Sequence, residues 1–197
     1  MTAHRAPGVS GSRGRSADRA LLLARLLNLA SIAGIIAVLS GSLYLQLVVG
    51  EQPCGLCEIQ RIGMYAVLIG PILNLTVGVR ARHYALSILV AVVMASVSEF
   101  QLLIHVVPGS GNPQHEVLGL HLWTWALLVF ALVILCSACM LLWPGQFQEE
   151  DSGVMAKPGP LRVASRVLFA VLLTYLMIMI VTVVRDCGLG ICRYLGS

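Results

Sequence analysis

The chain has 197 residues, of which 58% are hydrophobic and only 11% are charged. Because charged residues make up about a quarter of an ordinary soluble domain, this composition excludes a typical soluble protein and indicates a membrane protein. The formal net charge of +4 does not indicate a nucleic-acid surface, since the arginines stand at the ends of apolar segments and form no basic stripe with interleaved aromatic residues.

The first 20 residues contain Arg5, Arg13, Arg15 and Arg19 among small residues, and we expect them to form a disordered basic tail. A helix of about 20 apolar residues crosses the hydrocarbon core of a bilayer. Five stretches reach about that length, and we expect spanning helices at residues 26–49, 62–79, 84–106, 118–143 and 163–184.

The distribution of basic residues sets the direction of the five spans. With the N-terminus in the cytoplasm, most loop arginines and lysines fall on the cytoplasmic side, as the positive-inside rule requires. These residues are Arg80, Arg82, Lys157, Arg162 and Arg166, whereas Arg61, Arg185 and Arg193 fall outside. The chain then divides into the tail, a membrane domain over residues 21–143, and residues 144–197 with a cytoplasmic linker, the fifth span and a periplasmic tail.

The six cysteines form three close pairs, which indicates redox or metal chemistry. On the predicted topology, Cys54 and Cys57 lie in the first periplasmic loop, and Cys187 and Cys192 lie in the periplasmic C-terminal tail. Both pairs therefore face an oxidising compartment. The third pair, Cys136 and Cys139, lies near the cytoplasmic end of the fourth span, where we expect a structural role.

The Cys54-Gly-Leu-Cys57 motif stands directly before the second span. A helix N-terminus stabilises a thiolate through its N–H groups and dipole, and Arg61 lies one helical turn beyond Cys57. Two other interpretations of the pair remain open from the motif alone, an inert disulfide and half of a metal site. We predict no metal, because no second ligand pair with metal-knuckle spacing accompanies the motif.

Three segments carry a resemblance to a known family. They are Leu43-Tyr-Leu-Gln46, the string Pro53-Cys54-Gly-Leu-Cys57 with Gln60-Arg61, and Leu118-Gly-Leu120 followed by Trp123 and Trp125. Together they resemble the disulfide bond formation protein B (DsbB) family over residues 40–143. The resemblance implies an all-α membrane protein, a four-helix DsbB-like transmembrane bundle, to which this chain adds a fifth C-terminal transmembrane helix.

The resemblance also implies a function. It predicts a protein-disulfide oxidoreductase of the bacterial inner membrane that reoxidises a periplasmic thioredoxin-fold (DsbA-like) oxidase and passes the electrons to ubiquinone or menaquinone. Cys54 and Cys57 would be the redox pair, with Cys57 beside the quinone and Arg61 as the quinone-side cation. His105, near the periplasmic end of the third span, is a further candidate for contact with a quinone carbonyl.

The sequence departs from the family in one respect. Family members with the full electron path carry a second cysteine pair between the third and fourth helices, and residues 105–117 contain none. We hypothesise that Cys187 and Cys192 replace it, with a plain structural disulfide as the alternative.

Two other functions remain as alternatives. One is a non-catalytic membrane subunit whose periplasmic disulfides are static. The other is electron flow in the reverse direction, with Cys136 and Cys139 relaying electrons across the bilayer. Their position in a regular apolar helix without glycine argues against a relay, which needs mobile cysteines.

Overall fold

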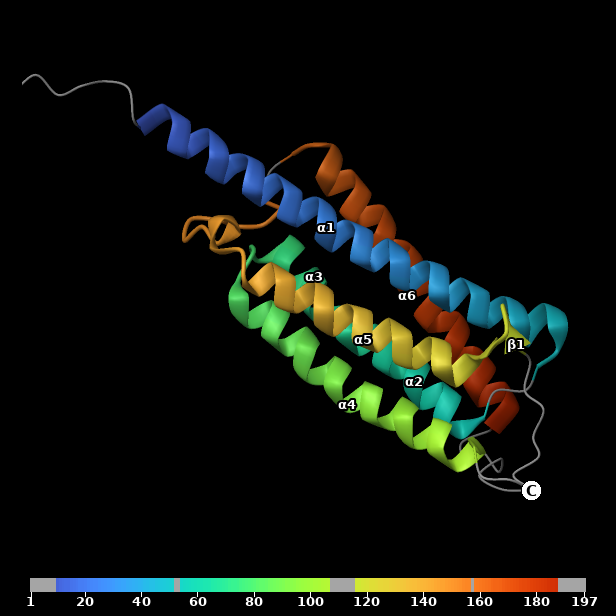
Figure 1. Ribbon diagram of the computed structural model, residues 1–197. Helices are drawn as coiled ribbons and strands as arrows, with labels where there is room; N and C mark the ends of the chain where they lie inside the picture. Colours follow the sequence, from blue (N-terminus) through green and yellow to red (C-terminus); the bar gives the residue numbers. More distant parts are fainter. Residues whose placement is uncertain (1–9, 52–53, 107–115, 157, 188–197) are drawn as a thin grey trace, which may run out of the picture.

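The computed structural model describes residues 10–51, 54–106, 116–156 and 158–187, which form an elongated bundle of helices (Figure 1). The helices are α1 (Ser10–Tyr44), α2 (Gly55–Val67), α3 (Ile69–Thr76), α4 (Ala81–Val106), α5 (Leu122–Leu141) and α6 (Pro160–Cys187). A π-helical turn, η1 (Leu45–Val49), extends α1, and a short 3₁₀ turn, η2 (Pro144–Gln146), follows α5.

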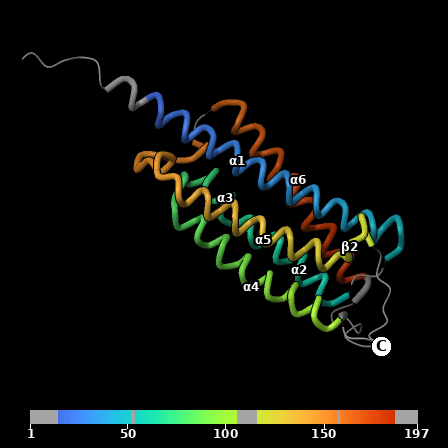
Figure 2. The backbone as a smooth tube through the Cα atoms, in the orientation of Figure 1, coloured from blue at the N-terminus to red at the C-terminus, as the bar shows by residue number. Residues whose placement is uncertain are grey.

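Five helical segments among the described residues are long and apolar enough to cross a membrane, which confirms the predicted helical membrane fold. They are Arg15–Val49, Gly55–Thr76, Ala81–His105, Leu122–Leu141 and Pro160–Arg185. The first four segments form the bundle, in which α4 packs along α5, while α6 packs mainly against α1. The backbone tube shows α6 beside α1 along the outside of the bundle (Figure 2).

The second span is broken where the sequence places Pro71. Because proline has no N–H, it cannot bond the carbonyl of Val67, four residues earlier. The hydroxyl of Ser87 on α4 donates to this carbonyl at 2.8 Å instead. The chain therefore bends between α2 and α3, and the carbonyl freed by the bend is satisfied by a neighbouring helix, as burial in a membrane requires.

The prediction of a disordered tail over residues 1–20 was wrong for its second half, since α1 begins at Ser10. Residues 1–9 lie outside the described part of the chain. The helix extends this far because it has partners that polarity alone does not indicate. Ala20 is buried, and the side-chain amide of Gln148 donates to the carbonyl of Ala17 at 2.9 Å.

The fourth span was predicted to begin at residue 118, but α5 begins at Leu122. The residues before it form a two-stranded antiparallel hairpin, β1 (Glu116–Val117) and β2 (Leu120–His121). At its tip Leu118 and Gly119 have φ angles of 54° and 77°, and two-residue hairpin turns of this kind require positive φ at both central positions. The apolar composition of this segment hid the turn.

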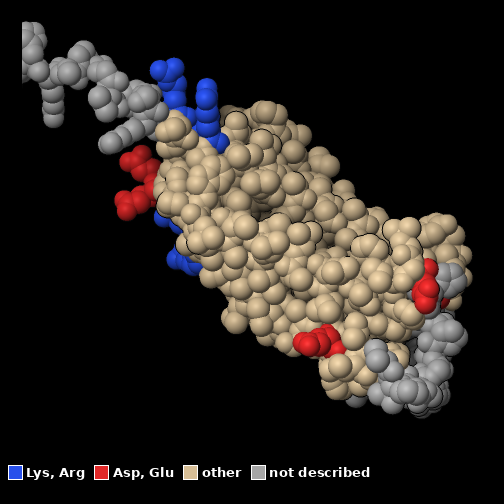
Figure 3. Space-filling model, viewed as in Figure 1, with Lys and Arg blue, Asp and Glu red and all other residues tan. Residues whose placement is uncertain are grey.

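The two ends of the bundle differ in charge. In Figure 3 the basic side chains in view gather at the end where α1 begins and α3 meets α4. At that end Asp151, in the segment between α5 and α6, is buried and accepts hydrogen bonds from Arg25 and from the backbone N–H of Val79, the latter at 2.8 Å. These bonds join the segment to α1 and to the turn between α3 and α4.

Candidate active site

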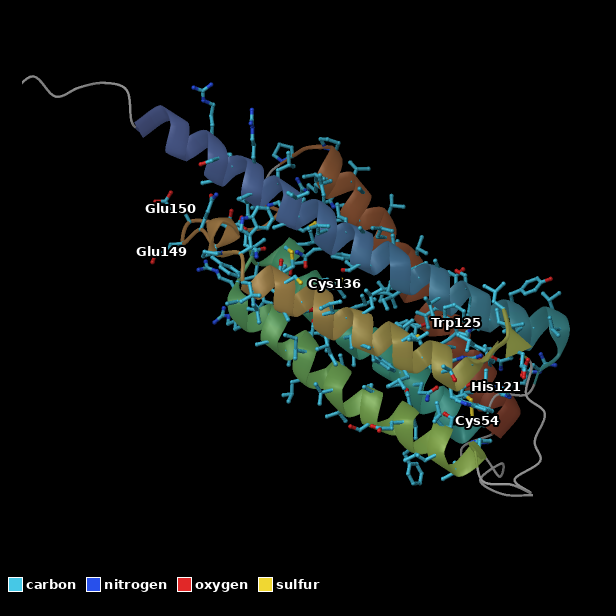
Figure 4. The ribbon with its side chains drawn as sticks, in the orientation of Figure 1. Cys54, His121, Trp125, Cys136, Glu149 and Glu150 are labelled. Atoms are coloured by element: carbon cyan, nitrogen blue, oxygen red, sulfur yellow. A yellow bond between two sulfur atoms is a disulfide. The ribbon has the colours of Figure 1, made fainter. Side chains whose placement is uncertain are left out.

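The motif cysteines lie at the opposite end of the bundle, at the start of α2 (Figure 4). Cys54 caps the helix in an extended conformation, and its sulfur accepts the backbone N–H of Cys57 at 3.1 Å. The two cysteines form a disulfide, and their Cα atoms are 5.1 Å apart. The pair therefore occupies the positive end of a helix dipole, where a thiolate is favoured.

A glutamine from α4 contacts both sulfur atoms. The side-chain nitrogen of Gln101 lies 3.2 Å from Sγ of Cys54 and 3.4 Å from Sγ of Cys57. Its side-chain oxygen accepts a hydrogen bond of 2.8 Å from the amide of Gln60 on α2. Both glutamines are buried, so the disulfide lies against a polar pair held between two helices.

Arg61 lies on α2 next to the redox motif, and its guanidinium is held by α1 and η1. Nε donates to the hydroxyl of Ser42 at 2.7 Å, and Nη2 donates to the Ser42 carbonyl at 3.2 Å. Nη1 donates to Gln46 at 2.6 Å and to Glu58 at 2.7 Å. Arginine carries five N–H donors, so among the described residues four have partners and one on Nη2 is left for a ligand.

A cavity of about 530 Å³ lies between α1, α2 and α5. Cys57, Gln60 and Arg61 contribute to one wall, whereas Cys54 is not among the lining residues. The other walls are mostly apolar and include Val38, Met64, Leu122, Trp125, Ala126 and Val129. The cavity therefore places one cysteine of the disulfide and one arginine beside an apolar space of ligand size.

The hairpin before α5 lies at this cavity. Val117 and Leu118 contribute to its lining, and the indole N–H of Trp125 donates to the carbonyl of Val117 at 2.9 Å. Trp125 thus fixes the hairpin to the helix that it precedes. The positive φ angles of Leu118 and Gly119 turn the chain back at this position, so that α5 can start beside the cavity.

The comparison with protein families matches the family described as "Disulfide bond formation protein DsbB" to residues 24–112. The match covers a little under half of the chain, and this part of the chain is similar to the DsbB family. The match includes both motif cysteines, Arg61 and Gln101, and it ends before the hairpin and α5. Neither the comparison with curated proteins nor the comparison with solved structures gave a match.

The similarity to the DsbB family indicates a membrane thiol–disulfide oxidoreductase, and the close Cys54–Cys57 pair agrees with that chemistry. The described residues contain no group of three or more His, Cys, Asp or Glu side chains able to hold a metal ion. This arrangement allows a disulfide to open and close next to an apolar cavity that has the Arg61 guanidinium in its wall.

His105 is not among the residues that line the cavity beside the DsbB-family motif. One ring nitrogen, Nδ1, lies 2.7 Å from the carbonyl of Gln101, and the ring stacks on Trp123 at a centroid distance of 4.4 Å. Trp123 also contacts His121, at 4.5 Å. The predicted contact of His105 with a quinone therefore has no support from the cavity, and the histidine stays a candidate on sequence grounds alone.

Of the other two cysteine pairs, the structure describes the side chains of one. Cys136 and Cys139 are free and exposed on α5, with Cys136 toward the end of the bundle away from Cys54 (Figure 4). Cys192 and the side chain of Cys187 lie outside the described residues, so their exchange role stays a prediction.

Sequence reasoning placed Cys54, Cys57 and Arg61 close together, as the structure does, but it missed the side chains that hold them. Ser42, Glu58 and Gln60 were assigned no role. Gln101, a polar residue in the third span, was a candidate either for a functional role or for hydrogen bonding between helices. One signal was available for Gln60 and Glu58, since polar residues within a span usually face protein or water rather than lipid. No signal in the sequence pairs Gln101 with sulfur atoms 44 and 47 positions away.

Proposed function

We propose that this DsbB-like protein reoxidises a periplasmic thioredoxin-fold (DsbA-like) thiol oxidase and passes the electrons to a membrane quinone. One observation carries the proposal: Cys57 of the disulfide and Arg61 share a wall of the same apolar cavity. The family supplies the thiol–disulfide chemistry, and the cavity supplies a site for an electron acceptor that dissolves in the bilayer.

The residues around the cavity fit a quinone. The cavity volume of about 530 Å³ is large enough for a quinone ring. The apolar walls suit the flat faces of a ring, and the remaining Nη2 N–H of Arg61 can donate to a carbonyl oxygen. A bound quinone supplies an acceptor for the two electrons and two protons that are released when a dithiol closes to a disulfide.

The protein's own cysteines have different tasks in this mechanism. The reduced carrier first exchanges with the Cys187–Cys192 disulfide, which leaves the carrier oxidised and Cys187 and Cys192 as thiols. A thiolate of this reduced pair attacks Sγ of Cys54, the Cys54–Cys57 bond breaks, and Cys57 leaves with the electron pair as a thiolate. The second thiolate then displaces Cys54, which restores the Cys187–Cys192 disulfide and yields a reduced Cys54–Cys57 pair. When the pair closes again, its two electrons leave through Cys57, the cysteine that lines the cavity. The acceptor takes up these electrons and the two thiol protons.

We further propose that the cysteine end of the bundle faces the periplasm of a bacterial inner membrane. The basic side chains at the opposite end support a cytoplasmic position for that end. The last helix, α6, ends on the same side of the bundle as Cys54 (Figure 4). This position supports Cys187 and Cys192 as an intermediate pair between the carrier and Cys54.

Quinone reduction by the purified protein, supplied with a reduced thioredoxin-fold donor, tests the proposal. We expect quinol formation by the wild type and none by Cys54→Ser, since the attack on the Cys54–Cys57 disulfide needs that sulfur. We also expect loss in the double variant Cys187→Ser/Cys192→Ser. The matched control is Cys136→Ser/Cys139→Ser, which removes two exposed cysteines that do not line the cavity and should turn over normally.

The outcomes separate the alternatives. Activity retained without Cys187 and Cys192 would make that pair structural and leave the enzyme intact. Activity lost in the Cys136/Cys139 control would favour the reverse electron path across the bilayer. No turnover by the wild type with either ubiquinone or menaquinone would contradict the proposal and favour a membrane subunit with static disulfides.

A further inference from the structure

The Cys54–Cys57 disulfide has a side-chain hydrogen-bond donor that comes from a different helix. We infer that Gln101 stabilises the thiolate formed when the Cys54–Cys57 disulfide opens, and that Gln60 is the positioning residue that aims the Gln101 amide at the sulfur atoms. The inference deepens the proposed function, on which it rests, by assigning the group that makes the disulfide easier to reduce.

The hydrogen-bond pattern determines which way the Gln101 amide points. Gln60 donates to the Gln101 oxygen at 2.8 Å, so the Gln101 nitrogen is the atom that faces the sulfurs, at 3.2 and 3.4 Å. The reverse orientation would place an oxygen against two sulfur atoms that have no hydrogen to donate while they form a disulfide. Gln101 is fully buried, so water does not compete for its N–H groups.

The amide contacts both reacting atoms, and this matters for the chemistry. When a donor thiolate attacks Cys54, the electron pair of the broken S–S bond goes to Cys57. When the donor leaves, the negative charge is on Cys54. A nitrogen with two N–H groups between the sulfurs can donate to the anion at either stage, and the backbone N–H of Cys57 adds a second donor to Cys54.

The hydrogen bonds favour the reduced state over the oxidised state. A donor interacts about twice as strongly with an ion as with a neutral acceptor, and a disulfide sulfur is neutral. The contacts therefore stabilise the thiolate more than the disulfide, which raises the reduction potential of the pair. Two polar side chains buried at the end of a span are otherwise costly, and this function accounts for their position.

The test is the thiol–disulfide equilibrium of Cys54 and Cys57, measured without any quinone. Full-length protein with serine at the other four cysteines is equilibrated in dithiothreitol buffers in detergent at pH 8, and free thiols are trapped with a maleimide. For Gln101→Met, which keeps the side-chain length and removes the donor, we expect a shift of about tenfold toward the disulfide, or about 30 mV to lower potential.

A second variant and a control make the result specific. Gln60→Met leaves Gln101 in place but removes its partner, so we expect a smaller shift in the same direction, and it replaces Gln101→Met if that protein does not fold. Ser98→Ala removes a buried hydroxyl one turn earlier on α4, whose hydrogen bond among the described residues goes to the carbonyl of Met94 on the same helix. The potential of this variant should equal that of the parent.

The proposed function and this inference fail in different ways. A parent pair that never equilibrates with dithiothreitol would contradict the proposed function and the inference together. A parent pair that equilibrates normally, with the same potential in Gln101→Met or in its replacement Gln60→Met, would overturn the inference alone. An equal shift in Ser98→Ala would also overturn it, because the effect would then belong to helix packing.

Discussion

Arg61 is a charged residue inside a membrane span, and such residues are costly unless their donors are satisfied. Here the guanidinium bridges α2 to Ser42 and Gln46 and forms an ion pair with Glu58, three residues earlier on its own helix. The charge is therefore compensated before any ligand binds. Its remaining N–H near the cavity is what the proposed quinone site uses.

Replacing Arg61 with lysine tests whether the shape of the guanidinium matters as well as its charge. Lysine keeps the charge but lacks the planar fork, so it cannot hold Ser42, Gln46 and Glu58 and still donate to a ligand. We expect the apparent KM for quinone to rise about tenfold, because one hydrogen bond from a charged group to the quinone is lost. The change in kcat should be smaller. Steady-state quinone titrations measure both constants.

The control for this variant is Arg82→Lys, since Arg82 is exposed near the start of α4, at the end of the bundle away from the cysteines. Its quinone KM should match the wild type. An unchanged KM in Arg61→Lys would remove Arg61 from the proposed quinone site.

For single residues, the sequence was sufficient to predict which side chains lie together when they are within one helical turn of each other. Cys54, Cys57 and Arg61 are recognisable because a helix start brings them together by spacing alone. Gln101 was recognisable only as a polar residue in a span, because its contact with the cysteines depends on how α4 packs against α2. For the same reason, the sequence did not show that His105 is absent from the residues that line the cavity.

At the scale of elements, the segment between α5 and α6 is anchored by one carboxylate. Burial alone would raise the pKa of Asp151. Hydrogen bonds from the backbone N–H groups of Val79 and Gly153 and from Arg25 outweigh burial and hold the pKa below its usual value. A carboxylate with a lowered folded-state pKa stabilises the fold above its unfolded pKa, and this contribution is lost as the pH falls through the folded-state pKa.

Asp151→Asn should therefore destabilise the protein at neutral pH, by about 2 kcal/mol, because the partly buried Arg25 loses its charged partner. As the pH falls below about 4, the ordinary range for an aspartate, the wild type should lose stability while the variant changes less, so their difference shrinks. Apparent melting temperatures in detergent between pH 3 and pH 7 measure this.

Glu150→Gln is the matched control, an exposed carboxylate next to Asp151, and it should melt like the wild type at every pH. A difference between wild type and Asp151→Asn that stays constant down to pH 3 would show that the charge of Asp151 contributes nothing.

The five spans were predictable because apolar length is written directly in the sequence. The errors were at element ends. The helical part of the predicted tail depends on contacts with the segment after α5, and the hairpin before α5 depends on positive φ at Leu118, a conformation that a leucine rarely adopts. Neither feature follows from hydropathy.

At the scale of the whole molecule, the two ends of the bundle differ in what they contain. At the end with the basic residues, the hydrogen bonds of Asp151 join the segment after α5 to α1 and to the turn before α4. The other end carries the disulfide and the cavity. The cavity could not be predicted, because it exists only where α1, α2 and α5 leave space between them. Its lining draws on segments as far apart in sequence as Ala37 and Val129.

Two glycines of α1 provide a test of whether the cavity beside Cys57 binds the electron acceptor. Gly41 lines the cavity and Gly34 does not, and a Cβ atom would meet no neighbour within 4 Å at either position. The measurement is the initial rate of quinol formation at limiting quinone for Gly41→Phe and Gly34→Phe, each with a reduced thioredoxin-fold donor.

We predict that Gly41→Phe occupies part of the cavity and lowers this rate about tenfold, which corresponds to about 1.4 kcal/mol of lost acceptor binding, while its Cys54–Cys57 pair still equilibrates with dithiothreitol. Gly34→Phe should retain the wild-type rate. Equal rates for the two variants, both close to the wild type, would contradict the account and place the acceptor elsewhere.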